Sequence, residues 1–454
     1  MFLSKKKIIV IFVILLLLFI FYSYRIISGF VKDGYDRQSK TVEIIKTIIP
    51  PHYVKKIKDN FFVVSKLKSR NEYLELQIKK YEQGLDGQIF KSEKIKINNE
   101  EYKLDYFFTP FKRLDVNLGW NAMKNSLRAH YLEVYHNKVL LISGEGQTIY
   151  FDKKNFLSKK LNYTNLENNI NEIIKDNNSE LIGIRDLYFH KDEVLISMLE
   201  KNDKGVTINI YAADMNFKKL NFKLYFQTND FWEYYNVFSG GRIEKFSDSE
   251  ILFSVGYAGV KGAAQNLNTT LGKIIKINTI NKSFEIVSIG HRNPQGLRYI
   301  KDKNIVINSE HGPKGGDEIN FNLLNKNNGE LINYGWDIAS YGTKYDGTDP
   351  FKKSHSKYGF KEPAKFYTPS IGISEILYFQ DSSHCPKKNC IWVSSLRANS
   401  VYILSLENNF ENLKSSDRLH LKKNRLRDID YDDELDLILL LSENIPAILV
   451  LTKI

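Results

Sequence analysis

Cysteine is scarce in this chain, because Cys385 and Cys390 are the only two among its 454 residues. Such a count excludes a disulfide-rich scaffold. The pair stands close together in the sequence HCPKKNC, and a zinc site would need two further ligands, of which only His384 is near. In an exported protein we expect the pair to form a disulfide that closes a short loop. Two free thiols are the alternative.

A dense basic stripe is also missing, although the net charge is +12. The 65 Lys and Arg residues and the 53 Asp and Glu residues are spread over the whole chain. A nucleic-acid groove would gather its basic residues and place aromatic side chains between them, so we exclude nucleic acid as a partner. The hydrophobic content of 43% is enough for a large core. A folded part of this length exceeds the usual single core unless it is a repeat or a barrel.

The N-terminus has no small-residue site at which a signal peptidase would cut. Three lysines (Lys5, Lys6 and Lys7) precede an apolar run over residues 8–21, and tyrosines follow it at a position that suits the membrane interface. The run is at the short end for a spanning helix. We expect a retained transmembrane anchor within residues 1–30, with a cleaved signal peptide as the alternative. The lysines predict a single-pass protein of the bacterial inner membrane with its body on the periplasmic side.

Residues 31–100 are expected to form a helical stalk between the anchor and the body. Apolar residues repeat with a period of seven between Tyr53 and Tyr81, and Asn60 and Asn71 interrupt the repeat. The sequence GLDG at 84–87 ends it. The pattern predicts either a coiled coil that pairs subunits in a homo-oligomer or one amphipathic helix that lies on the body.

The remaining residues, 101–454, show no long helical pattern. Short apolar segments separated by turns recur instead, as in 139–143 with 148–150, 194–198 with 206–211, 251–255 with 273–277, 391–394 with 401–404, and 437–441 with 447–451. Short antiparallel strands at roughly regular spacing over such a length indicate repeated sheets closed in a ring. A two-sheet sandwich is the alternative, although it would be unusually long.

Five motifs follow one another in the second half of the chain. They are GHRNPQGL at 290–297, SEHGPKGGDEIN at 309–320, NYGW at 333–336, SYG at 340–342 and RLRD at 425–428. Together and in this order they resemble the quinoprotein glucose/sorbosone dehydrogenase family, including the soluble glucose dehydrogenases and the aldose sugar dehydrogenases. The resemblance covers residues 120–454. It implies an all-β fold, a six-bladed β-propeller with its site at the top of the central channel.

The resemblance also implies a cofactor, pyrroloquinoline quinone (PQQ), which is a flat ring system with carboxylate groups. The positions that match cofactor-binding residues of the family are Arg292, Asn293, Gln295, Arg397, Arg425 and Arg427. Guanidinium groups suit carboxylates better than ammonium groups do. Arg425 and Arg427 are two apart on an expected strand, so we expect both to point to one face and Asp428 to the other.

Calcium is the second group that the resemblance implies. The carbonyls of Gly312 and Pro313 match a calcium site that also touches the cofactor. Asp317, Glu318 and the carbonyl of Tyr334 match a second, structural site. Ligand sets made only of oxygen favour calcium over transition metals. An ordinary acidic loop is the alternative.

Two positions depart from the family's catalytic pattern. Phe238 stands where the family has the His that acts as general base, and a phenyl ring cannot accept a proton. Tyr257 stands where the family has the Asp that orients this His. Arg397 replaces the family's usual Lys, which keeps the charge and changes the geometry. Glu233 is the nearby candidate for a substitute base.

Three interpretations therefore remain open. The chain is a membrane-anchored PQQ-dependent aldose dehydrogenase-like protein with altered chemistry, whose substrate is a sugar or another small polyol. Alternatively it is a non-catalytic propeller that binds a cofactor or a carbohydrate. The third interpretation is an interaction module on a stalk, because a fold alone does not fix a function.

Overall fold

The computed structural model describes residues 75, 87–111, 127–233, 238–326, 330–345, 351–406, 413–422 and 424–454. Residues Gln83–Ile454 form one compact unit. The expected anchor and nearly all of the expected stalk lie outside the described residues and stay predictions. Among the residues that are described, no helix is long and apolar enough to cross a membrane.

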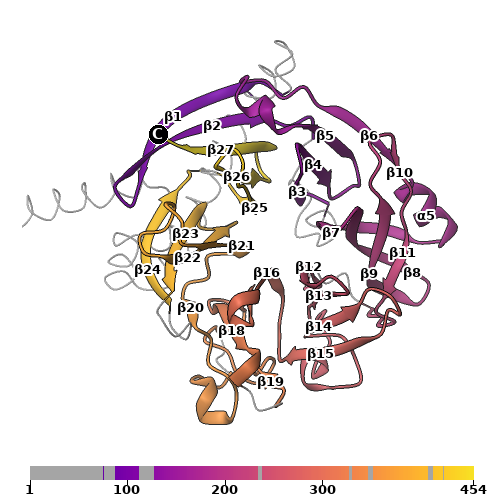
Figure 1. Cartoon of the computed structure of the whole chain (residues 1–454). Coiled ribbons are helices and arrows are strands. Elements are labelled where there is room, and N and C mark those ends of the chain that lie inside the picture. Colours follow the sequence, from indigo (N-terminus) through magenta and orange to yellow (C-terminus); the bar gives the residue numbers. More distant parts are fainter. Residues whose placement is uncertain are drawn as a thin grey trace, which may run out of the picture. The chain divides into compact units, whose positions relative to one another are not determined.

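The strands of the described part form six sheets arranged around a central axis (Figure 1). The innermost strands are β3, β7, β12, β16, β21 and β25, and each contacts the next, with β25 returning to β3. This arrangement confirms the predicted all-β, six-bladed propeller, and it excludes the two-sheet sandwich.

Each sheet, or blade, contains four or five strands. Blade 1 consists of β3 (His130–Tyr135), β4 (Lys138–Ser143), β5 (Thr148–Asp152), β6 (Thr164–Asn168) and β10 (Lys219–Leu220). Blade 2 consists of β7 (Glu180–His190), β8 (Glu193–Asn202), β9 (Gly205–Asp214) and β11 (Lys223–Gln227). Blade 3 consists of β12 (Gly240–Ser247), β13 (Glu250–Val255), β14 (Lys273–Asn278), β15 (Phe284–Ile289) and β19 (Ile332–Asn333).

The other three blades complete the ring. Blade 4 consists of β16 (Pro294–Ile300), β17 (Ile305–Glu310), β18 (Asp317–Leu323) and β20 (Lys365–Tyr367). Blade 5 consists of β21 (Ile373–Gln380), β22 (Asn389–Ser395), β23 (Ser400–Leu406) and β24 (Leu413–His420). Blade 6 consists of β25 (Leu426–Asp432), β26 (Leu437–Ser442), β27 (Ala447–Lys453), β2 (Glu100–Phe108) and β1 (Ile89–Ile97). The helical pieces are α5 (Ile170–Asp176) and the short 3₁₀ turns η1 (Lys153–Phe156), η2 (Ala263–Gln265), η3 (Lys301–Lys303), η4 (Leu324–Lys326) and η5 (His355–Tyr358).

Blade 6 closes the ring with strands from both ends of the compact unit. β2 pairs with β27, for example Tyr102 with Lys453, and β1 pairs with β2 on the outside (Figure 1). The propeller therefore begins before residue 101, the boundary expected from the sequence. The helical interpretation of residues 31–100 missed the alternation of exposed and less exposed residues in Ile89–Ile97, which is the period of a strand.

Blades bury both of their faces because each is packed between two neighbours. β26, with the sequence LILLLS, is buried along its whole length, and β27 is buried over its first five residues. Strands covered on both faces read as continuous apolar runs rather than as alternating ones. This packing explains why the C-terminal strands were easy to locate in the sequence.

Acidic residues near the axis connect blade 6 to blade 1 and blade 2 to blade 3. The carboxylates of Asp428 and Asp430 on β25 accept hydrogen bonds from the backbone N–H groups of Leu132 and Val134 on β3, both at 2.9 Å. Asp186 Oδ2 on β7 accepts one from the backbone of β12 at 2.7 Å. Since side-chain carboxyl oxygens accept from backbone N–H groups of the next blade, these hydrogen bonds fix the register between the two blades.

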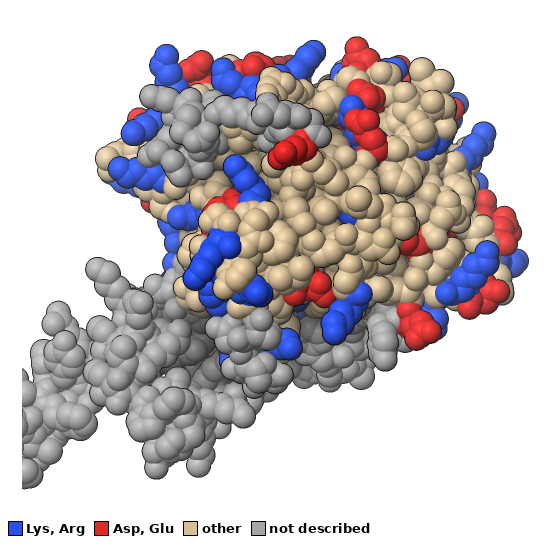
Figure 2. Space-filling model, turned by 90° about the horizontal axis from the view of Figure 1, so that it is seen from below, with Lys and Arg blue, Asp and Glu red and all other residues tan. Residues whose placement is uncertain are grey.

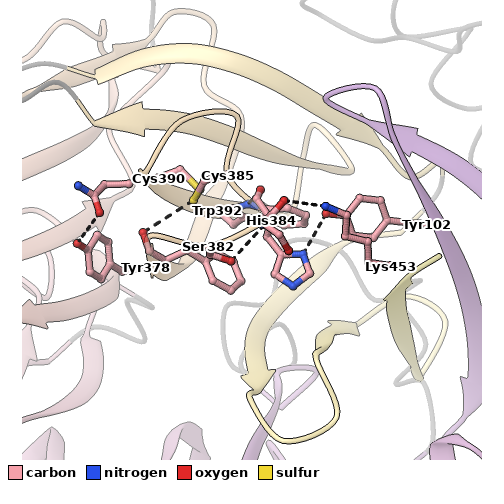
Figure 3. The surroundings of a disulfide bond; sticks show 11 residues. Tyr102, Tyr378, Ser382, His384, Cys385, Cys390, Trp392 and Lys453 are labelled. Carbon is pink, nitrogen blue, oxygen red and sulfur yellow. Dashed lines mark hydrogen bonds between the residues drawn. A yellow bond between two sulfur atoms is a disulfide. The ribbon is translucent and has the colours of Figure 1, made fainter.

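The predicted disulfide is present and joins Cys385, in the loop between β21 and β22, to Cys390 on β22 (Figure 3). Because the two sulfur atoms are bonded to each other, zinc binding by this pair is excluded. The neighbouring His384 is buried, and its Nδ1 lies 3.0 Å from Tyr102 Oη while its Nε2 lies 2.7 Å from Asp436 Oδ1. The loop of blade 5 is thus tied to two parts of the ring-closing blade 6.

Candidate functional site

An arginine hub fills the middle of the central channel. Arg242, on β12, is buried, and its Nη1 donates to Asp186 Oδ1 at 2.7 Å and to Asp428 Oδ1 at 2.9 Å. Its Nε lies 2.8 Å from Glu375 Oε2, and its Cζ lies 4.9 Å from the ring centroid of Tyr131. One cation therefore faces three carboxylates. Burial raises the pKa of Asp186 to about 8, against the opposing effect of Arg242.

Two β-bulges turn acidic residues of this hub into the channel. The register between β25 and β26 shifts between Leu426 and Asp428, and the register between β7 and β8 shifts between Ile184 and Asp186. A bulge breaks the strict alternation of sides along a strand. Asp428 therefore faces the channel together with Arg427, and the prediction that it points to the opposite face is wrong.

The mouth of the channel, as we use the term, is lined by Gln295, Arg425, Arg427 and Glu443. Arg427 donates from Nε to Glu443 Oε1 at 2.5 Å and from Nη1 to Gln295 Oε1 at 2.8 Å. Arg425 Nε lies 3.4 Å from Glu443 Oε2. Burial acts to raise the pKa of Glu443, but Arg427 and Arg425 outweigh it and lower the pKa. The structure thus brings Gln295, Arg425 and Arg427, all predicted from the sequence, together at one mouth. It adds Glu443, which was not predicted.

Arg185, on β7, is a further cation at this mouth that sequence reasoning missed. It is buried, and the charged or polar groups that act on it include Tyr131, Arg427 and Glu443. A signal was available in the sequence, because an Arg–Asp pair followed by one aliphatic residue occurs both at 185–186 on β7 and at 427–428 on β25. Treating the two pairs as equivalent positions of two blades would have found Arg185.

Arg292 and Asn293 lie beside the mouth, immediately before β16. Asn293 Oδ1 accepts from the backbone of Gly240 at 3.2 Å and from Gln295 Nε2 at 3.1 Å, which fixes the orientation of the amide. Asn293 Nδ2 therefore donates to His311 Nδ1 at 3.4 Å, so His311 carries its hydrogen on Nε2. Arg292 Nη1 donates to the His311 carbonyl at 2.8 Å. Arg292 Nε is buried without a hydrogen-bond partner among the described residues.

Aromatic side chains form one wall of the site, which we call the aromatic wall and define as Phe238, Tyr257 and Trp336. The Cζ atom of Arg292 lies 4.1 Å from the ring centroid of Phe238 and 5.3 Å from that of Trp336. Tyr257 stacks on Phe238 with an interplanar angle of 14° and meets Trp336 edge-on, with centroids 5.2 Å apart. The guanidinium of Arg292 is therefore held against rings by cation–π contacts.

Phe238 and Tyr257, the two positions at which we expected a departure from the family pattern, thus contact each other. The backbone fixes them there, because Ala258 N donates to the Phe238 carbonyl at 2.9 Å and Tyr257 N donates to the Arg292 carbonyl at 3.0 Å. Burial raises the pKa of Tyr257, so its phenol stays protonated at neutral pH. Glu233, the suggested substitute base, is exposed and stands next to residues 234–237, which are not described.

Two of the predicted structural calcium ligands, Asp317 and Glu318, have different surroundings. Asp317 and Glu318 are successive residues of β18, and successive side chains of a strand point to opposite faces. Asp317 Oδ1 accepts from the backbone of Gly312 at 3.1 Å, and its Oδ2 accepts from those of Gly372 and Ile373 at 2.7 and 3.1 Å. In the described part of the chain, no group of three or more His, Cys, Asp and Glu side chains could hold a metal. Asp317 therefore fits a loop tether better than a calcium ligand.

Glu318 has different surroundings. It is buried, in register with Glu310 on β17, and its Oε1 lies 3.7 Å from His355 Nε2. Burial, with the nearby charge of Glu310, raises the pKa of Glu318 well above its usual range. Tyr334, whose carbonyl was the third predicted ligand, is also buried. A cation would relieve the cost of burying this carboxylate.

Two other predicted positions, Pro313 and Arg397, lie outside the set of residues that we define as the mouth. The Pro313 carbonyl, one of the two expected to face a cofactor-bound calcium, accepts from Ser370 Oγ at 3.2 Å. Arg397 is exposed and lies between β22 and β23, next to Leu396, whose carbonyl accepts from Arg425 Nη1 at 3.3 Å. On the face shown in Figure 2, basic and acidic side chains of the described residues are interspersed.

Comparison with known proteins gives relatives of the expected kind. The chain is 30% identical over 193 residues to the uncharacterised protein slr1608 of Synechocystis, covering 37% of this chain and 45% of the relative. It is 27% identical over 181 residues to the aldose sugar dehydrogenase YliI of Escherichia coli, covering 37% of this chain and 47% of the relative. The match thus spans less than half the length of either relative.

Solved structures show the same fold. A glucose dehydrogenase crystal structure aligns with a TM-score of 0.58 at 20% identity, covering 72% of this chain and 97% of that one. The PQQ-bound form of an aldose sugar dehydrogenase from Streptomyces coelicolor aligns with a TM-score of 0.50 at 18% identity, covering 77% of this chain and 98% of that one. At such identities the likeness shows the fold alone. The sequence profile of the Glucose / Sorbosone dehydrogenase family matches residues 159–450, which is well over half of the chain, so this protein belongs to that family.

Proposed function

We propose that this protein is a PQQ-dependent sugar dehydrogenase-like propeller that binds the cofactor but oxidises common aldoses very poorly. The observation that carries the proposal is the contrast between the two sides of the site, a mouth lined by guanidinium groups and a wall lined by aromatic rings. Family membership and the PQQ-bound neighbour from Streptomyces coelicolor support the choice of cofactor.

The side chains of the mouth fit a flat polyanion such as PQQ. Arg185, Arg425 and Arg427 surround a single carboxylate, that of Glu443, so positive charge is in excess there. Arg292 adds a fourth guanidinium, and its buried Nε lacks a partner among the described residues. Unmet buried donors cost free energy that an acceptor on a ligand recovers. Arg292, Arg425 and Arg427 would hold the cofactor's carboxylates, and Gln295 would fix its orientation.

If bound at this mouth, PQQ would supply the hydride-accepting chemistry, with Arg292, Arg425 and Arg427 as the residues that would hold it. The chain's own part is to orient the sugar and to remove its hydroxyl proton, and here that second task is not met. Phe238 and Tyr257 occupy the family's positions for the base and its orienter, and neither a phenyl ring nor a protonated phenol accepts a proton at neutral pH. The site thus has residues suited to binding the cofactor and lacks a residue suited to removing the proton of the sugar hydroxyl.

The test is dye-linked oxidation of D-glucose by the full chain loaded with PQQ and calcium. We expect the double variant Phe238→His with Tyr257→Asp to exceed the wild type by about 10²–10⁴ in rate, the usual worth of a general base. Each single variant should gain less, because an imidazole without its orienting carboxylate takes the wrong tautomer for part of the time. Wild-type turnover equal to that of an active aldose sugar dehydrogenase would contradict the proposal and direct attention to Glu233.

Cofactor binding is measured separately by titrating the protein with PQQ and following its absorbance. Arg427→Gln should weaken PQQ binding at least about tenfold, since one charge-assisted pair is lost. Lys245→Ala is the matched control, because Lys245 forms an exposed pair with Asp248 on the same blade as the aromatic wall. No uptake of PQQ by the wild type would remove the quinoprotein part of the proposal and leave a non-catalytic propeller.

We also propose calcium binding at two sites, one at the carbonyls of Gly312 and Pro313 beside the cofactor and a structural one at Glu318 and the Tyr334 carbonyl, where Asp317 is instead engaged by backbone N–H groups. An ion bound only by the folded state raises the melting temperature by mass action, so excess chelator should lower it. Glu318→Gln should abolish that response. An unchanged melting temperature together with no calcium in elemental analysis would argue against the ion.

Membrane anchoring through residues 1–30 and pairing through the stalk remain proposals from the sequence. They support a single-pass protein whose propeller faces the periplasm. The full-length chain should then sediment with membranes and resist extraction by salt, and protease added to spheroplasts should reach the propeller. Recovery of a soluble form that starts near residue 30 would show cleavage instead.

A further inference from the structure

Glu443 has a place at the mouth that is set by the pairing of two neighbouring strands. Arg425 stands directly before β25 and Glu443 directly after β26, and the pairing of these strands begins with Leu426 opposite Ser442. The backbone N–H of Glu443 donates to the Arg425 carbonyl at 2.9 Å. The backbone therefore brings the side chain of Glu443 to the guanidinium groups, and no ligand is needed to place it there.

This one carboxylate faces several cations. Glu443 Oε1 accepts from Arg427 Nε at 2.5 Å, and its Oε2 lies 3.4 Å from Arg425 Nε. The charge of Arg128 also acts on Glu443, and the charge of Glu443 acts on Arg185. Burial acts to raise the pKa of Glu443, but the guanidinium groups lower it, so the carboxylate is ionised at neutral pH. Without this charge, several like charges would stand close together, which costs free energy.

The two arginines that contact Glu443 are not held equally. Arg427 has 10% of its side chain exposed, and its Nη1 also donates to Gln295 Oε1 at 2.8 Å. The side chain of Arg425 is 38% exposed, and its contacts with Glu443 and with the Leu396 carbonyl are 3.4 and 3.3 Å long. A carboxylate in solution can therefore reach Arg425 directly, and it then shares this guanidinium with Glu443.

A bound polycarboxylate and Glu443 would act against each other. Both need the same guanidinium groups, and two carboxylates close together repel. A carboxamide in place of the carboxylate would keep an oxygen that accepts from Arg427 Nε and would remove the repulsion. In the ligand-free protein, however, the carboxamide would leave the arginines without their negative partner. One substitution is thus expected to destabilise the free protein and to strengthen ligand binding.

We infer that Glu443 takes the place of a ligand carboxylate in the free protein, so that it stabilises the mouth and lowers the affinity of the mouth for polycarboxylates. The inference rests on the proposed function where the ligand is PQQ, and it extends to any flat polycarboxylate that reaches the same guanidinium groups. Glu443 is in this sense an affinity-determining residue, and it takes no part in the reaction itself.

PQQ and benzene-1,3,5-tricarboxylate, a flat tricarboxylate without a quinone, are the two probes. PQQ binding to the full chain is followed by absorbance, and tricarboxylate binding by calorimetry. Glu443→Gln should bind both probes at least about tenfold more tightly than the wild type, the worth of one charge-assisted contact. The melting temperature of the ligand-free variant should fall by about 3–5 °C.

A residue with only a structural role would lower the melting temperature and weaken binding as well. Unchanged, weaker or undetectable binding of both probes by Glu443→Gln would therefore overturn the inference. Tighter binding of the tricarboxylate, with no PQQ uptake by the wild type or the variant, would remove the proposed function and leave the role of Glu443 standing.

Two further variants separate charge from shape. Glu285→Gln makes the same change in net charge at an exposed side chain of β15, and it should alter neither affinity nor melting temperature. Glu443→Asp keeps the charge on a shorter side chain, so a gain in affinity equal to that of Glu443→Gln would contradict the inference. If Glu443→Gln does not fold alone, it is refolded with excess tricarboxylate, and failure of this ligand to restore the fold would contradict the inference too.

Discussion

At the scale of single residues, Arg242 is the side chain on which the centre of the propeller depends. Its guanidinium is shared among Asp186, Glu375 and Asp428, which come from three other blades. Removing one partner of a buried ion pair leaves an uncompensated charge and costs about 3–5 kcal/mol. With three acids left behind, the structure predicts a loss at the upper end of this range.

Arg242→Met should therefore lower the free energy of unfolding by about 3–5 kcal/mol in urea denaturation. Lys245→Ala removes an exposed cation from the same strand, and exposed pairs contribute about 0–1 kcal/mol, so this control should change little. Equal effects of the two substitutions would show that the hub adds no more than a surface pair.

At the scale of elements, ring closure depends on the contact between blade 5 and blade 6. The disulfide holds the loop between β21 and β22, and His384 in this loop contacts Tyr102 on β2 (Figure 3). His384 also contacts Asp436, which follows β25. Trp392 Nε1 adds a hydrogen bond to the His384 carbonyl at 3.3 Å. Opening the loop loosens the blade in which the first and last strands of the compact unit meet.

Replacing Cys385 and Cys390 by Ser should lower the free energy of unfolding by about 2 kcal/mol, the chain-entropy value for a loop of this length. A reducing agent should lower the melting temperature of the wild type by a similar amount and leave the double variant unchanged. A wild-type melting temperature that does not respond to reduction, with reduction verified by thiol counting, would contradict this role.

At the scale of the whole molecule, the acids along the axis give stability a pH dependence. Burial raises the pKa of Asp186 to about 8 and that of Glu244 to about 7, although Arg242 and Arg298 oppose it. A carboxyl with a raised pKa keeps a proton in the folded state that the unfolded chain has released. Its contribution is thus greatest below the unfolded pKa near 4 and is lost as the pH rises toward the folded value.

The free energy of unfolding should therefore fall between about pH 6.5 and pH 8, by at most about 1.4 kcal/mol per pH unit for each such group. Burial lowers the pKa of His130 to about 4. This histidine makes the free energy of unfolding rise with pH, but only below its unfolded pKa near 6.5. Urea denaturation across this range measures the slope, and Asp186→Asn should reduce it. A stability that rises over the same interval would show that the axial acids are ionised in the folded state.

Local patterns were sufficient for the fold class and for several site residues. Period-two alternation and continuous apolar runs, such as those of β26 and β27, predicted short strands in a ring, because strand formation depends on neighbours in sequence. The spacing of Cys385 and Cys390 predicted their disulfide. The motifs gave Arg425, Arg427 and Gln295, which the structure brings together at the mouth.

Other features follow only from contacts between distant segments. A bulge in β25 moves Asp428 to the channel side, because shifting the register by one residue changes the face of a strand. The carboxylate of Asp317 accepts hydrogen bonds from the backbone N–H groups of Gly372 and Ile373. The guanidinium of Arg292 packs on the ring of Phe238, which lies more than fifty residues earlier in the chain. The amino-acid sequence by itself determined that this chain builds a propeller with a cationic mouth. The tertiary structure alone decided which charges meet there, because each blade supplies only one side of the channel.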